Sequence, residues 1–298
     1  MTVDGRPRDP EGLSDLLDRM LSRVVHGPSL LDLRRSHLEL RPTLPATGTG
    51  SCQPVTGPLD NQVVLEFGNG RQHVEEQPAT LVPALNDVDA VFLIWPFFDS
   101  EEEARRKVDP IANLLGDSVP RVVYLSSQGV ENDRHNFWSV VEDAIVDHVE
   151  EWTLLRPTGF AANARQWIPQ ITNGQVVRWP FGQMARPLIH EADIAAVAVE
   201  ALLRSGHQGR KYVLTGPEMV TQEAQVHTIG SALDKDLKWE EISRDRAAQD
   251  FDLPDMMLDA WEQFIDDPEP ITDEVRRLTG QPALSVTDWA CDNVGEFL

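Results

Sequence analysis

Two pairs of residues that could contact a ligand stand directly after apolar runs of the chain. Ser126 and Ser127 follow RVVYL, and Trp95 and Pro96 follow AVFLI. Ligands of open parallel sheets bind outside the carboxyl ends of the strands, so residues in these positions can meet at one edge and form a site. The alternative is structural: Trp95 and Pro96 would turn the chain, and the serine hydroxyls would bond to the local backbone.

The segments that must position these residues alternate between strands and helices. The run 88–95 is apolar almost throughout, which is typical of a strand buried on both faces. Ser100 has the character of a helix N-cap, and acidic residues follow it. The pattern predicts strands at 88–95, 121–126 and 152–156, separated by helices at 100–115 and 136–149. This alternation predicts an α/β fold, with a Rossmann-type parallel sheet flanked by helices.

The remaining elements divide the chain into a core and a lobe. We expect short strands at 63–67, 176–179, 211–214 and 237–242, helices at 79–85, 160–171 (broken at Pro169), 190–203 and 221–233, and acidic amphipathic helices from there to Leu298. Residues 46–160 and 190–215 should form the nucleotide-binding core, and 161–189 with 216–298 a smaller, mostly helical lobe. Residues 1–45 form an N-terminal extension, whose amphipathic helix at 11–25 packs on its own body or at an interface.

The front of the chain lacks the usual start of a nucleotide-binding fold. There, a glycine-rich turn after a strand lets the backbone approach a phosphate at a helix N-terminus. The nearest candidates are Gly48 and Gly50, but the preceding segment 41–45 is a poor strand and Pro54 would break the following helix. We keep both glycines as cofactor-binding candidates in a degenerate first βαβ unit. We interpret residues 1–77 as a truncated, rearranged or frame-shifted start.

The composition excludes several classes of function. The 298 residues carry a formal net charge of −23, which makes nucleic acid an unfavourable partner. Cys52 and Cys291 indicate neither a disulfide framework nor a paired-cysteine metal site. No apolar run approaches the roughly 20 residues that cross a bilayer, and the N-terminus lacks a signal-peptide pattern. We expect a cytoplasmic protein with no metal site and no membrane partner.

Several motifs after Pro78 carry a resemblance to a known family. They are ATLVPAL, VDAVFLIWPF, RVVYLSSQGV, WTLLRPTGFAAN, LIHEADIA, and YVLTGPE followed by a helix with a threonine cap. In this order and spacing, the chain from Pro78 to Leu298 resembles the NmrA-like branch of the atypical short-chain dehydrogenase/reductase proteins, which are NAD(P)-binding Rossmann folds. The resemblance implies NADP or NAD as the cofactor, with NADPH favoured.

The same resemblance implies roles for the residues at the strand ends. Trp95 and Pro96 would lie near the adenine and ribose of the cofactor. Ser126 and Ser127 would lie beside the nicotinamide, and Pro157 would also contact the cofactor.

The turn after the third strand would then contact the substrate. The resemblance implies that Thr158, Phe160 and Asn163 face the substrate, while Gly159 lets the backbone turn there. An aromatic residue after a turn is usually part of a core, so a structural role for Phe160 is the alternative.

One departure from the family concerns catalysis. Its catalytic members use a Tyr-x-x-x-Lys pair, because lysine and cofactor together lower the pKa of the tyrosine hydroxyl so that it acts near neutral pH. The segment 137–142 has neither residue, and Glu142 is expected on a solvated helix face. His190 and Asp193 fit a structural cap at a helix start better than a catalytic dyad. The catalytic residues are therefore unassigned.

Three functions remain open at the level of the sequence. The first is an NAD(P)H-dependent oxidoreductase that transfers a hydride to a small carbonyl, quinone-like or similar electrophile, with the proton taken from water or from an unassigned group. The second is a non-catalytic NAD(P)-sensing regulator or interaction protein, which the absent tyrosine and lysine favour. The third is a degenerate paralogue that binds no cofactor. A small-molecule substrate is the expected partner, and a homodimer is open.

Overall fold

The computed structural model describes residues 62–66, 78–95 and 100–298. They divide into two compact units. The first unit holds the described residues up to Arg156, together with Ala195–Tyr212, and the second holds Pro157–Ile194 and Val213–Leu298. Each unit is described by itself below.

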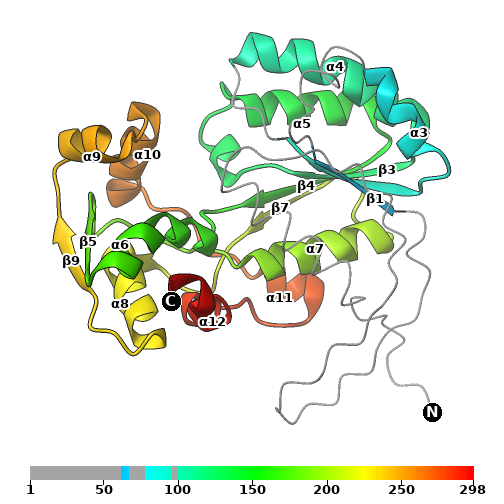
Figure 1. The fold of residues 1–298 in the computed structure, drawn as a ribbon. Coiled ribbons are helices and arrows are strands. Elements are labelled where there is room, and N and C mark those ends of the chain that lie inside the picture. Colours follow the sequence, from blue (N-terminus) through cyan, green and yellow to red (C-terminus); the bar gives the residue numbers. More distant parts are fainter. Residues whose placement is uncertain (1–61, 67–77, 96–99) are drawn as a thin grey trace, which may run out of the picture. The chain divides into compact units, whose positions relative to one another are not determined.

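The first unit is built on a five-stranded sheet with the strand order β1-β2-β3-β4-β7 (Figure 1). The strands are β1 (Gln62–Glu66), β2 (Ala90–Ile94), β3 (Arg121–Leu125), β4 (Glu151–Pro157) and β7 (Arg210–Leu214). The first four run parallel, and Ile94 lies beside Leu125 in the register. The carboxyl ends of β2 and β3 therefore share one edge, as the sequence predicts.

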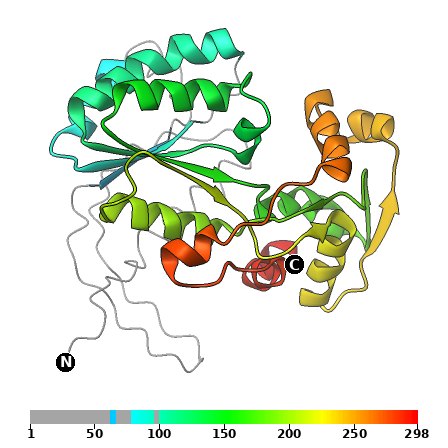
Figure 2. The same cartoon turned by 180° about the vertical axis from the view of Figure 1, so that it is seen from behind.

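Helices cover both faces of this sheet (Figures 1 and 2). On one face lie α3 (Val82–Leu85), α4 (Glu101–Ser118) and α5 (Phe137–His148), and on the other lies α7 (Glu191–Leu203). Alternate strand residues such as Leu93, Val122 and Tyr124 join the buried cluster that includes α4 and α5. The predicted α/β fold, with a parallel sheet flanked by helices, is confirmed.

Local side-chain signals account for the helix starts. The side chain of Ser100 accepts a hydrogen bond from the backbone N–H of Glu103 at 3.4 Å, and Asn136 accepts one from Ser139 at 3.0 Å. Such caps satisfy backbone donors that have no partner within the helix. Because these signals are local, the sequence predicts the starts of α4 and α5 correctly.

The second unit combines two small sheets with short helices. Its strands are β5 (Val176–Trp179), parallel to β9 (Lys238–Glu241), and β6 (Ala185–Arg186), antiparallel to β8 (Val220–Thr221). Its helices are the 3-10 segments η3 (Ala161–Trp167) and η4 (Val294–Phe297), and α6 (Ile168–Asn173), α8 (Gln222–Ala232), α9 (Arg244–Phe251), α10 (Asp255–Asp266), α11 (Glu274–Thr279) and α12 (Val286–Asp292). Trp167, Trp179 and Trp289 are almost fully buried in it.

The structure differs in one respect from the helix predicted at 160–171. The sequence predicts one helix with a break at Pro169, whereas the chain forms η3 up to Trp167 and then begins α6 at Ile168. Pro169 lies in the first turn of α6, where a backbone N–H has no helical partner and its loss costs nothing. The proline therefore starts a helix instead of interrupting one.

Several expectations fall outside the residues that the structure describes. These are the helix at 11–25, both candidate glycines of the phosphate turn, Gly48 and Gly50, and Pro96. Within the described ranges, no helix is long and apolar enough to span a membrane, and no group of His, Cys, Asp and Glu side chains has the arrangement of a metal site.

Candidate functional site

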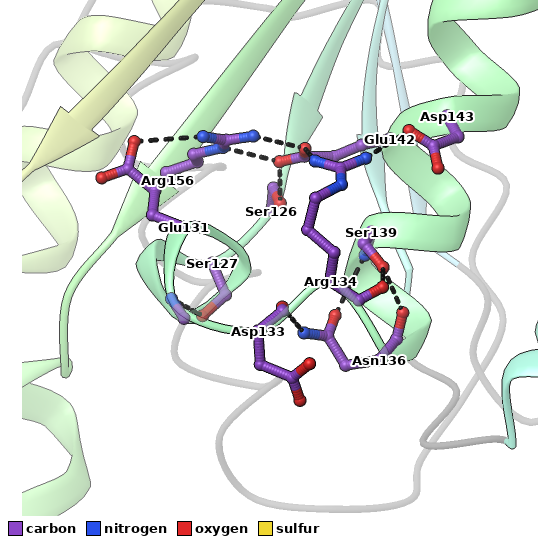
Figure 3. Close-up of polar contacts among 11 residues, drawn as sticks. Ser126, Ser127, Glu131, Asp133, Arg134, Asn136, Ser139, Glu142, Asp143 and Arg156 are labelled. Carbon is purple, nitrogen blue, oxygen red and sulfur yellow. Dashed lines mark hydrogen bonds and ion pairs between the residues drawn. The ribbon is translucent and has the colours of Figure 1, made fainter.

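Ser126 is buried at the carboxyl end of β3. Its backbone N–H donates to the carbonyl of Leu155 at 2.7 Å, which continues the pairing between β3 and β4. Its hydroxyl donates to Oε1 of Glu142 at 2.6 Å, and the side chain is 4% exposed (Figure 3). The hydroxyl hydrogen is thus already used, and the oxygen can only accept a further bond.

Glu142 projects from α5 into a buried ion pair. Arg156, on β4, donates from Nε to Oε1 at 2.8 Å and from Nη2 to Oε2 at 2.6 Å. Its Nη1 donates to Glu131 at 3.1 Å. These bidentate, charge-assisted bonds are strong ones, and the bond to Glu142 raises the pKa of the guanidinium (Figure 3).

The expectation that Glu142 lies on a solvated face is wrong. Its side chain is 1% exposed. The helical pattern around Glu142 gives no sign of this, because its partner Arg156 lies on another element and meets it only through the fold. The carboxylate of Glu142 is therefore held inside the protein by Arg156 and Ser126.

Ser127 differs from Ser126 in what its hydroxyl can still do. Its oxygen accepts a hydrogen bond from the backbone N–H of Gly129 at 3.2 Å, which caps the 3-10 helix η2 (Gln128–Glu131). No described residue accepts a bond from its hydroxyl hydrogen, and the side chain is partly exposed. Of the two serines, Ser127 is the one that can donate to a ligand.

Gln128 is a candidate that the sequence analysis misses. Its side chain is 2% exposed, and Oε1 has no hydrogen-bond partner among the described residues. Buried polar groups nearly always have a partner, so an amide oxygen without a donor directly after Ser127 fits a ligand that supplies one. Only its place after the serines could have indicated it.

Neither tyrosine of the chain can take the role of the tyrosine in a Tyr-x-x-x-Lys pair. The sequence contains only Tyr124 and Tyr212. Tyr124 lies on β3 in the core, and burial, reinforced by the charge of Glu142, raises the pKa of its hydroxyl well above the ordinary value. Tyr212 lies on β7, with its hydroxyl 3.0 Å from Nδ1 of His207. Tyr124 stays protonated and inert at neutral pH, and neither residue lies on α5.

The turn after β4 belongs to the second unit. Thr158 is buried and its hydroxyl donates to the carbonyl of Pro187 at 2.7 Å. Phe160 pairs with Ile189 and is half-buried, so it is not fully in the core, while Asn163 is exposed. The hydroxyl of Thr158 therefore supports the turn, whereas Phe160 and Asn163 retain surface for a ligand.

The two other predicted strand-end residues of the described chain are buried. Trp95 follows β2 and is 4% exposed, and Pro157 ends β4. Trp95 belongs to the first unit and Pro157 to the second. The structure brings Ser126, Ser127 and Gln128 together with the Glu142–Arg156 pair, within the first unit.

His190 and Asp193 form the start of α7, as the cap interpretation expects. The backbone N–H of Ala192 donates to Nδ1 of His190 at 3.1 Å. Oδ2 of Asp193 accepts from the N–H of Leu284 at 2.8 Å, which ties the helix start to a distant loop. Burial raises the pKa of Asp193 to about 6.

Comparison with known proteins finds reductases that are similar in sequence to this chain. No family model matches the chain. It is 33% identical over 231 residues to the (4-alkanoyl-5-oxo-2,5-dihydrofuran-3-yl)methyl phosphate reductase of Streptomyces griseus, covering 74% of this chain and 80% of the relative. It is 24% identical over 233 residues to the NAD(P)H azoreductase of Xenophilus azovorans, covering 74% and 81%.

A solved structure has the same fold. The Citrobacter sp. triphenylmethane reductase complexed with NADP(H) superposes with a TM-score of 0.63 at 15% identity, covering 74% of this chain and 81% of that one. The identity to the Streptomyces reductase, together with this shared fold, shows that the chain belongs to the NmrA-like atypical short-chain dehydrogenase/reductase family of Rossmann-fold proteins.

Proposed function

We propose that this protein is an NAD(P)H-dependent oxidoreductase that reduces a small electrophilic substrate, with NADPH as the favoured cofactor. The observation that carries the proposal is that, among the described residues, the amide oxygen of Gln128 has no donor and the hydroxyl of Ser127 has no acceptor, at the strand edge where ligands of such sheets bind. The family supports it, since the relatives above are named as reductases and one is named for NAD(P)H.

The residues at this edge fit an amide-bearing cofactor. The oxygen of Ser126 can accept from an amide N–H, because its own hydrogen is held by Glu142. Gln128 can accept another hydrogen bond, and Ser127 can donate one to a carbonyl oxygen. The phosphate-binding part of the site would involve Gly48 and Gly50, which remain proposals, as do the cofactor contacts of Trp95, Pro96 and Pro157.

The chemistry follows from which donors are present. When bound, NAD(P)H supplies a hydride to an electrophilic carbon of the acceptor and becomes NAD(P)⁺. The acceptor then takes one proton, so that it gains two electrons and two hydrogens in total. No tyrosine stands on α5, and the hydroxyl of Ser126 is engaged, so the proton comes from water or from an unassigned group. The Glu142–Arg156 pair acts as a positioning group that fixes Ser126.

Steady-state oxidation of NADPH tests the proposal. With 2-methyl-1,4-naphthoquinone as the acceptor, we expect the absorbance of NADPH at 340 nm to fall in proportion to enzyme. Gln128→Ala should raise the KM for NADPH by about fivefold to tenfold, the effect of one hydrogen bond. Thr228→Ala removes an exposed hydroxyl on α8 of the other unit and should change neither KM nor kcat. An unchanged KM in Gln128→Ala would contradict the assigned cofactor contact.

A second function has a specific observation in its favour. The buried pair of Glu142 and Arg156 stands where a catalytic tyrosine and lysine would act, which suits a protein that binds NAD(P) and regulates a partner. Such a regulator would bind NADPH, but would not oxidise it when quinones, azo dyes and enones are each offered as the acceptor. A partner protein captured only in the presence of NADPH would support this second function.

Other parts of the proposal concern the surroundings of the protein. We propose a cytoplasmic location and a small-molecule substrate held by the lobe of residues 161–189 and 216–298, with the core at 46–160 and 190–215. A homodimer is also proposed, and light scattering of the purified full chain distinguishes it from a monomer.

A further inference from the structure

Arg186 is a fixed guanidinium in the second unit. It lies on β6 and donates to the carboxylate of Glu269 from Nε at 2.6 Å and from Nη2 at 2.7 Å. The ring of Phe264, on α10, lies 4.4 Å from its Cζ. The side chain of Glu269 is 2% exposed and that of Arg186 is 15% exposed. This guanidinium therefore has one orientation and remains reachable from outside.

One edge of the guanidinium has no hydrogen-bond partner among the residues that the structure describes. No described residue accepts a hydrogen bond from Nη1, whereas the edge formed by Nε and Nη2 is filled by Glu269. A guanidinium has five N–H donors in a fixed plane, so the two on Nη1 are available to a ligand.

This open edge lies against the turn that is predicted to contact substrate. A Cβ placed on Gly159 would stand 2.6 Å from Cζ and 2.7 Å from Nη1 of Arg186, so the guanidinium packs directly against the backbone of this glycine. The same turn continues into Phe160 and Asn163, which retain ligand-accessible surface. The Nη1 group of Arg186 thus lies beside the turn from which Phe160 follows.

The charge at this edge decides which ligands it suits. The buried carboxylate of Glu269 neutralises Arg186 and lies on the same guanidinium as any atom that Nη1 binds. A carboxylate, sulfonate or phosphate would gain a hydrogen bond but would be repelled by Glu269, and such repulsion is strong where water is partly excluded. A neutral carbonyl oxygen gains the hydrogen bond without that cost.

We propose that Arg186 binds a carbonyl oxygen of a neutral substrate through Nη1, and that Glu269 makes this part of the lobe select against anionic substrates. The inference rests on the proposed function, because it names the substrate class of the proposed reductase. The proposed substrate class differs from that of a relative whose name specifies a phosphate ester. Arg186 and Glu269 are thus specificity-determining residues.

Equilibrium binding of two matched probes tests this. The probes are 2-(hydroxymethyl)anthraquinone and anthraquinone-2-sulfonate, which share a ring system and differ in charge, and their dissociation constants for the full chain are measured without nucleotide. We expect the wild-type protein to prefer the neutral probe. Glu269→Gln leaves Arg186 with an unneutralised charge and should shift the preference toward the sulfonate on the order of tenfold. Arg186→Lys replaces the planar guanidinium by an ammonium group and should weaken the binding of the neutral probe.

Glu296→Gln is the matched control. Glu296 is another arginine-paired glutamate of the same unit, which accepts from Arg165 and not from Arg186, so the variant has the same change in net charge and leaves the Arg186–Glu269 pair intact. Its probe preference should equal that of the wild type. A gain of sulfonate binding in Glu269→Gln cannot come from misfolding, which would weaken both probes.

Two results would overturn the proposal: no binding of either probe to the wild-type protein, or an unchanged preference in Glu269→Gln. NADPH binding is measured separately on the same preparations. If NADPH does not bind but the probe preference shifts as expected, the reductase function fails while the role of Arg186 and Glu269 stands.

Discussion

At the scale of single residues, Glu142 and Glu131 share one partner but differ in burial. Both accept from Arg156, yet Glu142 is 1% exposed and makes two of the bonds, while Glu131 is 41% exposed and makes one. Breaking a buried ion pair leaves an uncompensated charge and costs about 3 kcal/mol or more, whereas an exposed pair contributes about 1 kcal/mol or less.

Glu142→Gln should therefore lower the free energy of unfolding by about 3 kcal/mol. Glu131→Gln is the matched control, with an expected loss below about 1 kcal/mol. Urea titrations followed by tryptophan fluorescence measure both. Equal losses in the two variants would mean that Glu142 does not anchor the end of β3.

Asp193 should make the stability of the protein depend on pH. Burial raises its pKa from 3.8 to about 6. Between these two values the folded state binds more protons than the unfolded state, so the contribution of Asp193 to the free energy of unfolding falls as pH rises from about 4 to about 6. Above about pH 6 the carboxylate is charged and buried in the folded protein, which is the unfavourable state.

Asp193→Asn keeps an oxygen for the N–H of Leu284 and removes the charge. It should stabilise the protein at pH 7 by about 2 to 3 kcal/mol, since one pKa unit corresponds to about 1.4 kcal/mol, and the gain should vanish near pH 4. Asp273→Asn, at an exposed position, controls for the change in net charge. A pH-independent difference from wild type would show that Asp193 does not titrate as described.

At the scale of elements, α4 and α5 approach closely because Gly116 has no side chain. A Cβ at Gly116 would lie 2.0 Å from the carbonyl oxygen of His148, a backbone atom that cannot move aside alone. Gly116→Ala should push the ends of the two helices apart and cost about 1 to 3 kcal/mol, as overpacking does.

Gly295→Ala provides the comparison, because no atom lies within 4 Å of a Cβ there. Thermal unfolding of both variants should show a lower melting temperature for Gly116→Ala only. If the two variants melt together, the close packing of α4 on α5 is not what limits stability.

The elements were predictable to the extent that their signals are local. The cap at Ser100 and the apolar run of β2 each act within a few residues, so their positions follow from the sequence. Arg186 and Glu269 are 83 positions apart, and Glu142 and Arg156 lie on different elements. Only the folded chain brings such pairs together, so a pattern read along the sequence cannot reveal them. The missing partner of Gln128 is likewise visible only once its burial is known.

At the scale of the whole molecule, the family resemblance and the fold agree. The motifs after Pro78 predict the family, and the first relative covers 74% of the chain at 33% identity. The strand predicted at 63–67 is present as β1 beside β2, one residue earlier. The candidate phosphate turn at Gly48 and Gly50 lies outside the described residues, so nucleotide binding remains the central point to test.

Thermal unfolding of the purified full chain with NADPH, with NADH and without ligand tests that point most directly. A ligand at about 100 times its dissociation constant adds roughly 2.7 kcal/mol to the folded state, which corresponds to a rise in melting temperature of roughly 5 °C or more. We predict such a rise with NADPH and a smaller one with NADH. No rise with either nucleotide at millimolar concentration would contradict the proposed reductase and the nucleotide-dependent regulator alike.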